Sequence, residues 1–151
     1  MLITGGARSG KSAFAERLAR ESGLAVGYIA TAAASDEDMR ARIARHRAQR
    51  PAEWATFEMY RGFESLESDA RFDACGLFLL DCLTTLATNR MMDSGLDFDT
   101  CALAEVDKLE ASITAEVDAL LDMMERRDKR LVVVTNEVGM GLVPAYRMGN
   151  L

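Results

Sequence analysis

Short apolar runs alternate with longer amphipathic stretches along this chain, and this alternation is its clearest structural signal. Apolar runs of strand length predict five strands, at residues 2–4, 26–30, 54–58, 77–81 and 131–135. Apolar positions spaced by three and four predict helices between them, at residues 11–21, 36–50, 63–71, 83–92 and 99–127. Strands that alternate with helices indicate an α/β fold with a mainly parallel sheet.

Local signals define the ends of the second predicted helix. Ser35 is the expected N-cap, because its hydroxyl can accept a backbone N–H of the first turn and Asp38 follows three residues later. Pro51 ends the helix, because the residue before a proline avoids helical geometry. In sheets of this kind ligands bind at the carboxyl ends of the strands, so functional residues are expected directly after each strand.

The clearest chemical motif follows the first strand. The stretch GGARSGKS, residues 5–12, fits the pattern G-x-x-x-x-G-K-[ST] and lies between a strand and a helix, as a phosphate-binding loop does. Glycines allow successive N–H groups to point at phosphate oxygens, and the helix N-terminus adds a partial positive charge. Lys11 is expected to reach the β- and γ-phosphates, and Ser12 to offer its hydroxyl to Mg²⁺.

Acidic residues lie at the ends of two other strands. Asp81 ends the run LFLLD and is the candidate acid for binding Mg²⁺, although an acid at this position could instead cap the next helix. Glu137 follows the last strand and could orient the metal or the nucleophile, or only stabilise its loop. Cys82 lies beside Asp81, and without a second histidine to activate it we interpret it as a core residue.

Composition narrows the class of protein. With 151 residues, 49% of them hydrophobic and 28% charged, the chain has the size of one globular domain. No apolar run approaches the ~20 residues of a membrane span, and the first residues lack the features of a signal peptide, so we expect a cytoplasmic protein. Three cysteines without a CxxC pair favour reduced thiols. The isoelectric point near 4.9 argues against nucleic-acid binding.

The charge is unevenly distributed, because residues 40–50 contain five arginines and no acid in a chain whose net charge is −6. The same stretch holds His46, the only histidine. A solvated helix end is the simplest interpretation of such a stretch. Arg42 lies one turn before His46, so both project from the same face of the predicted helix. A bound triphosphate would give these arginines a function, because its charge must be neutralised.

Several stretches together resemble one known family. GGARSGKS (5–12), YIAT (28–31), RIARHRAQRPAEW (42–54), LLDCLTTLATN (79–89) and TNEVGMGLVP (135–144) resemble, in this order, the bifunctional adenosylcobinamide kinase/adenosylcobinamide-phosphate guanylyltransferases of cobalamin synthesis. The resemblance runs essentially from end to end. It implies a P-loop NTPase (RecA-like) three-layer sandwich and a homo-oligomer, with a trimer as the expected form. Members continue past the Val-Pro pair, so we expect residues 1–151 to be a single P-loop domain that lacks the family's C-terminal helix and strand.

The resemblance also implies two reactions on small-molecule substrates. ATP or GTP, with Mg²⁺, first phosphorylates adenosylcobinamide. GMP is then transferred from GTP to adenosylcobinamide phosphate through a guanylylated histidine, and only His46 can match that histidine. The chemistry is plausible on its own terms, because a neutral imidazole can attack the α-phosphorus and form a phosphoramidate.

The predicted site residues fall into three groups. The catalytic residues are His46 and Lys11, and the metal ligands are Ser12 and Asp81. The nucleotide-binding residues are Gly5, Gly6, Ala7, Arg8, Ser9, Gly10, Lys11, Ser12, Ala30, Thr31, Arg47, Arg50 and Glu58. Ala30 and Thr31 are assigned from the resemblance of YIAT. Glu58 ends the third strand and could contact the base or ribose, or only be solvated.

Two other functions remain open from the sequence. The chain could be a kinase alone, with the histidine region gripping phosphates without covalent chemistry. It could also be a nucleotide-switched regulatory domain, although the guanine-specific motif [NT]-K-x-D of GTPase switches does not occur in the sequence.

Overall fold

The computed structural model describes residues 1–6, 8–34 and 36–137, which form a sheet of five strands. Every neighbouring pair of strands is parallel, and their order across the sheet is β1-β5-β4-β2-β3. The strands are β1 (Leu2–Gly5), β2 (Val26–Ala30), β3 (Ala55–Glu58), β4 (Leu77–Asp81) and β5 (Arg130–Asn136). The prediction of a mainly parallel sheet is therefore confirmed.

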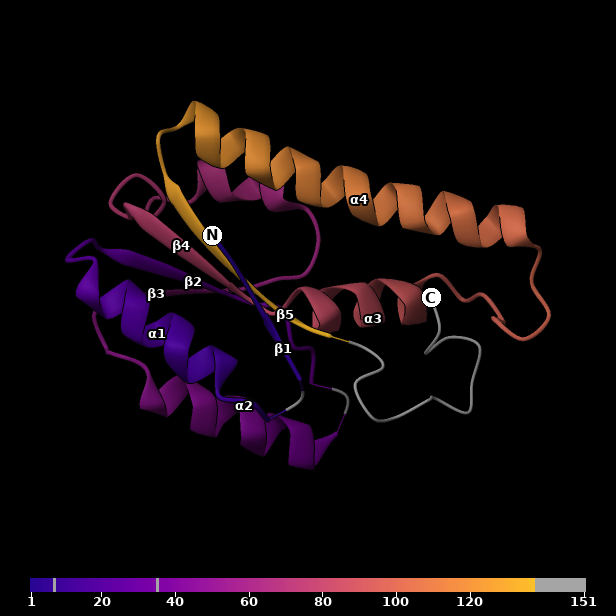
Figure 1. Ribbon diagram of the computed structural model, residues 1–151, viewed down its shortest axis with the longest axis horizontal. Helices are drawn as coiled ribbons and strands as arrows, with labels where there is room; N and C mark the ends of the chain where they lie inside the picture. Colours follow the sequence, from indigo (N-terminus) through magenta and orange to yellow (C-terminus); the bar gives the residue numbers. More distant parts are fainter. Residues whose placement is uncertain (7, 35, 138–151) are drawn as a thin grey trace.

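Helices cover both faces of the sheet and complete three layers (Figure 1). On one side lie α1 (Lys11–Glu21) and α2 (Glu37–Gln49). On the other lie the 3-10 helix η1 (Phe63–Ser68), α3 (Leu83–Asp93) and α4 (Leu103–Arg126). The predicted α/β three-layer sandwich is confirmed. Among the described residues, no helix is both long and apolar enough to cross a membrane.

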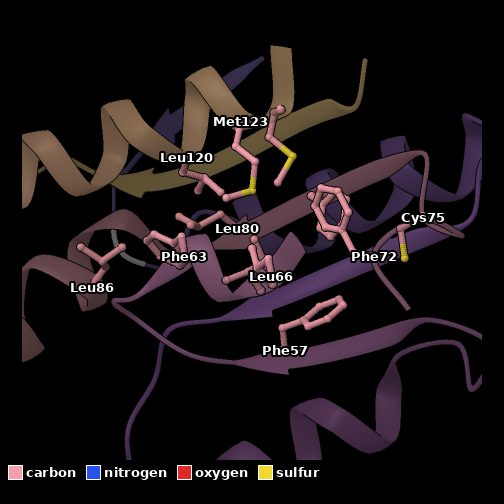
Figure 2. Close-up of a cluster of buried hydrophobic side chains, with 12 residues drawn as sticks. Phe57, Phe63, Leu66, Phe72, Cys75, Leu80, Leu86, Leu120 and Met123 are labelled. Atoms are coloured by element: carbon pink, nitrogen blue, oxygen red, sulfur yellow. The ribbon is translucent and has the colours of Figure 1, made fainter. Parts of the chain in front are cut away.

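Two apolar clusters hold these layers together, one on each face of the sheet. β2 is buried along its whole length, and β4 is buried up to its last residue, as expected for central strands that helices cover on both sides. The cluster beneath α4, η1 and α3 is rich in aromatic rings (Figure 2), and the cluster beneath α1 is mostly aliphatic, with Tyr28 as its one buried aromatic residue in the described part of the chain. The small residues Ala15 and Ala19, both fully buried, let α1 approach the sheet closely.

The register of the strands brings their carboxyl ends to one edge of the sheet. Ala30 of β2 pairs with Glu58 of β3 on one side and with Asp81 of β4 on the other. Gly5, where the phosphate loop begins, pairs with Asn136 at the end of β5. The sequence-predicted strand-end residues therefore lie along one edge.

Three predicted element boundaries are wrong. Asp36, and not Ser35, is the N-cap of α2, because its carboxylate accepts the N–H of Met39 at 2.7 Å; Ser35 itself lies outside the described residues. The predicted helix 63–71 is a 3-10 helix that ends at Ser68. The long helix begins at Leu103 and not near residue 99, because the Glu105 carboxylate accepts the N–H of Ala102 and caps the helix there.

α2 differs from the other helices in how little it packs. None of its side chains is buried, and its apolar residues Met39 and Ile43 are only half-buried. Arg50, directly after the helix, is by contrast only 9% exposed. The buried attachment of α2 therefore lies at its C-terminal end.

Gly27 provides a test of the packing of the sheet. A methyl group at this position would lie 2.6 Å from a ring carbon of Phe78 on the neighbouring strand. We expect Gly27→Ala to lower the free energy of unfolding by about 1–3 kcal/mol through overpacking, as measured by urea denaturation. Because Phe78→Leu removes the clashing ring atoms, the double variant should be more stable than the sum of the two single losses. Strictly additive losses would contradict this packing.

Candidate active site

The phosphate loop closes around the side chain of Lys11. This side chain is only 9% exposed, and its ammonium group donates to the carbonyl oxygen of Gly6 at 2.5 Å and to the hydroxyl of Ser9 at 3.3 Å. The loop therefore holds the lysine charge at its centre, where a phosphate oxygen would meet it.

Two glycines make this loop geometry possible. A methyl group on Gly5 would lie 2.9 Å from the Ser9 hydroxyl oxygen, so a larger residue would displace that hydroxyl from its contact with Lys11. Gly10 has φ of 81°, a left-handed conformation that side chains disfavour, and it forms the N-cap of α1. No side chain of the described residues caps α1, so its first N–H groups are available to an anion. Ala7, also predicted in this loop, lies outside the described residues.

Asp81 lies at the same edge and is held by a neighbouring strand. The hydroxyl of Tyr28 on β2 donates to Oδ2 of Asp81 at 2.5 Å. The alternative that Asp81 caps α3 is wrong, because Cys82 is the N-cap and its sulfur accepts the N–H of Thr85 at 3.4 Å. Cys82 is half-buried and borders the apolar cluster under α1, in agreement with its interpretation as a packing residue.

Thr31 holds the turn that follows Asp81. Its hydroxyl donates to the carbonyl oxygen of Cys82 at 2.7 Å and accepts the N–H of Cys82 at 2.8 Å. Its side chain is fully buried, and its backbone carbonyl accepts from the amide of Asn89 at 2.7 Å. In this structure the Thr31 side chain therefore acts on the β4–α3 turn.

Four of the predicted site residues lie at the C-terminal end of α2. The exposed side chains of Arg47 and Glu58 form an ion pair at 3.3 Å. His46 is exposed on α2. The Arg50 guanidinium donates to the carbonyl oxygen of His46 and to the hydroxyl of Thr56, both at 3.3 Å. Arg50 is thus engaged with protein groups, whereas His46 faces outward.

Charged groups on α2 and β4 both affect the pKa of Glu16 on α1. The pKa of Glu16, on α1, is raised above its ordinary value, first by burial and then by the nearby Asp81 carboxylate. The charges of Arg20, Arg50 and His46 act in the opposite direction. His46 and Asp81 therefore act in opposite directions on the pKa of the same carboxyl group on α1.

A family model described as cobinamide kinase/cobinamide phosphate guanyltransferase matches residues 1–151. The chain belongs to this family. Among its relatives are the bifunctional adenosylcobalamin biosynthesis proteins CobU of Escherichia coli K12, with 41% identity over 148 residues, and CobP of Pseudomonas aeruginosa, with 45% identity over 144 residues. These alignments cover 98% and 95% of this chain and 80% and 74% of the respective relatives. CobU of Salmonella typhimurium LT2 is 39% identical over 148 residues.

The remaining strand-end residues have structural partners in this member of the family. Asn136 donates its N–H to the hydroxyl of Thr84 on α3 at 2.9 Å. Glu137 donates its N–H to the carbonyl oxygen of Gly5 at 3.0 Å and accepts from the Thr4 hydroxyl at 3.1 Å. Glu137 thus fastens the end of β5 to the start of the phosphate loop. The rest of the stretch TNEVGMGLVP lies outside the described residues.

Two residues of the site escaped sequence analysis. Glu16 lies four positions after Ser12, so helical spacing places both on one face of α1. Tyr28 lies two positions before Ala30, so strand alternation places both on one face of β2. These spacings were visible in the sequence, but they do not reveal that Asp81 lies beside them.

The donor set fits a magnesium ion bound together with a nucleotide. The Ser12 hydroxyl and the Asp81 carboxylate are hard oxygen ligands, and Mg²⁺ in such sites takes its other ligands from water and phosphate. Among the described residues no group of three His, Cys, Asp or Glu side chains could hold a metal ion alone. Two protein donors would leave the other ligand positions of such an ion to water and phosphate oxygens.

The buried hydroxyl of Thr31 allows a direct test of how the turn at Asp81 is held. Thr31→Val keeps the shape but leaves the N–H and carbonyl of Cys82 without this partner, so we expect a loss of roughly 2–4 kcal/mol in unfolding free energy. Thr31→Ser keeps the hydroxyl and should lose no more than about 1 kcal/mol. Urea denaturation measures both, and equal losses would contradict the role of the hydroxyl.

Proposed function

We propose that this chain carries out both reactions of its family, phosphorylation of adenosylcobinamide and transfer of GMP from GTP to adenosylcobinamide phosphate. The observation that supports this most directly is a phosphate loop with a buried Lys11 at the same sheet edge as Asp81, while the exposed His46 lies on α2, which covers the same face of the sheet as α1 (Figure 1). The relatives named bifunctional adenosylcobalamin biosynthesis proteins support the same assignment.

In the kinase step, the phosphate loop would bind ATP or GTP. The N–H groups at the start of α1 and the ammonium group of Lys11 would hold the phosphate oxygens, and Arg8 would add charge from the exposed side of the loop. Ser12 and Asp81 would hold Mg²⁺, which neutralises charge on the β- and γ-phosphates. The hydroxyl oxygen of adenosylcobinamide attacks the γ-phosphorus and forms a new P–O bond. The bond from the γ-phosphorus to the bridging oxygen breaks, the nucleoside diphosphate leaves, and the hydroxyl proton passes to solvent.

In the guanylyltransferase step, a ring nitrogen of His46 attacks the α-phosphorus of GTP. An N–P bond forms, the α–β P–O bond breaks, and pyrophosphate leaves. A phosphate oxygen of adenosylcobinamide phosphate then attacks the same phosphorus. The N–P bond breaks, and adenosylcobinamide-GDP is released. The exposure of His46 suits this role, because the imidazole must meet two different substrates in turn.

The other predicted nucleotide-binding residues form two groups, one with exposed and one with buried side chains. Arg47 and Glu58 are exposed and paired with each other, so a nucleotide could replace one partner in that pair. We propose that Arg47 neutralises the departing pyrophosphate and that Glu58 contacts the base or ribose. Ala30, Thr31 and Arg50 are buried, and we propose that they shape the site through backbone and charge rather than through exposed side chains.

The histidine assignment predicts a covalent adduct. Incubation with α-³²P-labelled GTP and Mg²⁺ should label the protein with an acid-labile, alkali-stable GMP group, because a phosphoramidate hydrolyses in acid. His46→Ala should lose the label, which phosphorimaging of the gel measures. Arg45→Ala, a neighbouring change on the same helix, serves as the matched control. Equal labelling of wild type and His46→Ala would refute the assignment, and absence of label with intact kinase activity would favour a kinase alone.

A second prediction tests whether both reactions share the phosphate loop. Lys11→Ala removes the side-chain charge at the centre of the loop, and we expect both activities to fall below about one-hundredth of the wild-type rates. Product formation is followed separately for each step by chromatography. Retention of either activity would show that the two reactions use separate phosphate sites.

We further propose a cytoplasmic homo-oligomer, with a trimer as the expected form, that acts on small molecules and not on nucleic acid. The three cysteines are all unpaired, which suits a reducing compartment. Exposed apolar side chains on α3 and α4, Met92, Leu103 and Leu121, offer contact area to a second copy. The single-domain organisation of residues 1–151 stays a prediction.

A further inference from the structure

The hydroxyl group of Tyr28 is not needed for the packing of its ring. The side chain is only 4% exposed and belongs to the apolar cluster under α1, where it stacks on Trp54 with 6.4 Å between ring centroids. A phenylalanine would make the same contacts. A buried phenol must find a hydrogen-bond partner, and here that partner is a carboxylate at the candidate metal site.

Strand register explains why the Tyr28 hydroxyl meets Asp81. Ala30 pairs with Asp81, and Tyr28 lies two residues earlier on the same face of β2, opposite Leu79. The long phenol ring spans this offset toward the edge of the sheet, and its hydroxyl lies 2.5 Å from Oδ2 of Asp81. Among the described residues, this is the hydrogen bond that the Asp81 side chain accepts. It restricts rotation of the carboxylate and leaves Oδ1 without a hydrogen-bond partner among the described residues.

The Tyr28 ring is in turn braced by Arg50. The central guanidinium carbon lies 3.8 Å from the ring centroid, within the range of a cation–π contact. The same guanidinium donates to the carbonyl oxygen of His46 and to the hydroxyl of Thr56. Contacts through Arg50 and Tyr28 therefore connect the backbone of α2 at His46 to the carboxylate of Asp81.

We propose that Tyr28 is a positioning residue whose hydroxyl orients the Asp81 carboxylate toward the cation of a magnesium–nucleoside triphosphate complex. Arg50, stacked on the ring, keeps the phenol in place and ties it to the end of α2. The inference rests on the proposed function, because it requires a magnesium–nucleotide complex at this edge of the sheet. Hydrogen-bond donors that hold a ligating carboxylate commonly change metal affinity 10–100-fold when removed.

The test measures binding rather than turnover. Isothermal titration calorimetry gives the affinity for α,β-methylene GTP, which cannot transfer GMP because carbon bridges its α- and β-phosphorus atoms. Each protein is titrated with this analogue twice, once in buffer that contains Mg²⁺ and once in buffer that contains EDTA. We expect Tyr28→Phe to weaken binding about tenfold or more in Mg²⁺ and to leave binding in EDTA unchanged.

Tyr60→Phe is the matched control. It removes a second tyrosine–aspartate hydrogen bond, from Tyr60 to Oδ2 of Asp93 at 2.7 Å, which is exposed and lies at the far end of α3 from Asp81. Its Mg²⁺-dependent affinity should equal that of the wild type. Circular dichroism melting establishes that both variants remain folded.

A double variant separates positioning from packing. Asp81→Asn should lose the Mg²⁺-dependent part of the affinity, and adding Tyr28→Phe to it should cause no further loss, because the hydroxyl acts through the carboxylate. Additive losses, or a loss in Tyr28→Phe that is equal in Mg²⁺ and EDTA, would overturn the positioning role. Wild-type Mg²⁺ dependence in Tyr28→Phe would also overturn it while leaving the proposed function intact. If Mg²⁺ did not change the affinity of the wild-type protein for the analogue, both the positioning role of Tyr28 and the proposed function would be overturned.

Discussion

The parallel pairing of β4 between β2 and β5 is the constraint on which the rest of the structure depends. In a parallel sheet all strands end at the same edge, so three residues that are far apart in sequence, Gly5, Ala30 and Asp81, meet there. After each strand the chain must return across the sheet before it can begin the next parallel strand. The helices make these crossovers, and they bury both faces of the sheet. The site is thus a consequence of sheet polarity, and each loop adds only local chemistry.

Buried polar contacts convert this edge into a defined site. Thr31 is fully buried and satisfies both backbone groups of Cys82, which fixes the turn after the metal-ligand candidate. Arg50 is buried and lies against Tyr28. Such groups are costly to bury without partners, and the hydrogen bonds and the cation–π contact they make restrict the local geometry. The same contacts attach α2, which has no buried side chains of its own, to the sheet.

The arginines of residues 40–50 have different partners in the structure. Five arginines within residues 40–50 appear equivalent in the sequence. In the structure Arg50 supports the protein itself, Arg47 pairs with Glu58 in solvent, and Arg40 pairs with Glu37 at the start of the same helix. Exposed ion pairs of this kind contribute little to stability, so they can exchange partners when a more highly charged anion arrives.

The sequence by itself determined the class of fold, the glycine-rich loop before α1 and, to within about one residue, the end of each strand. These depend on local signals, namely apolar periodicity, glycine spacing and the lysine and serine that follow. It also contained the spacing that puts Tyr28 and Ala30 on one face of a strand. Only the tertiary structure decided that Tyr28 meets Asp81, that Thr31 holds Cys82 and that Arg50 is buried. The reason is physical: the order and register of strands arise from packing between distant segments, and no single stretch of sequence encodes which strand lies beside which.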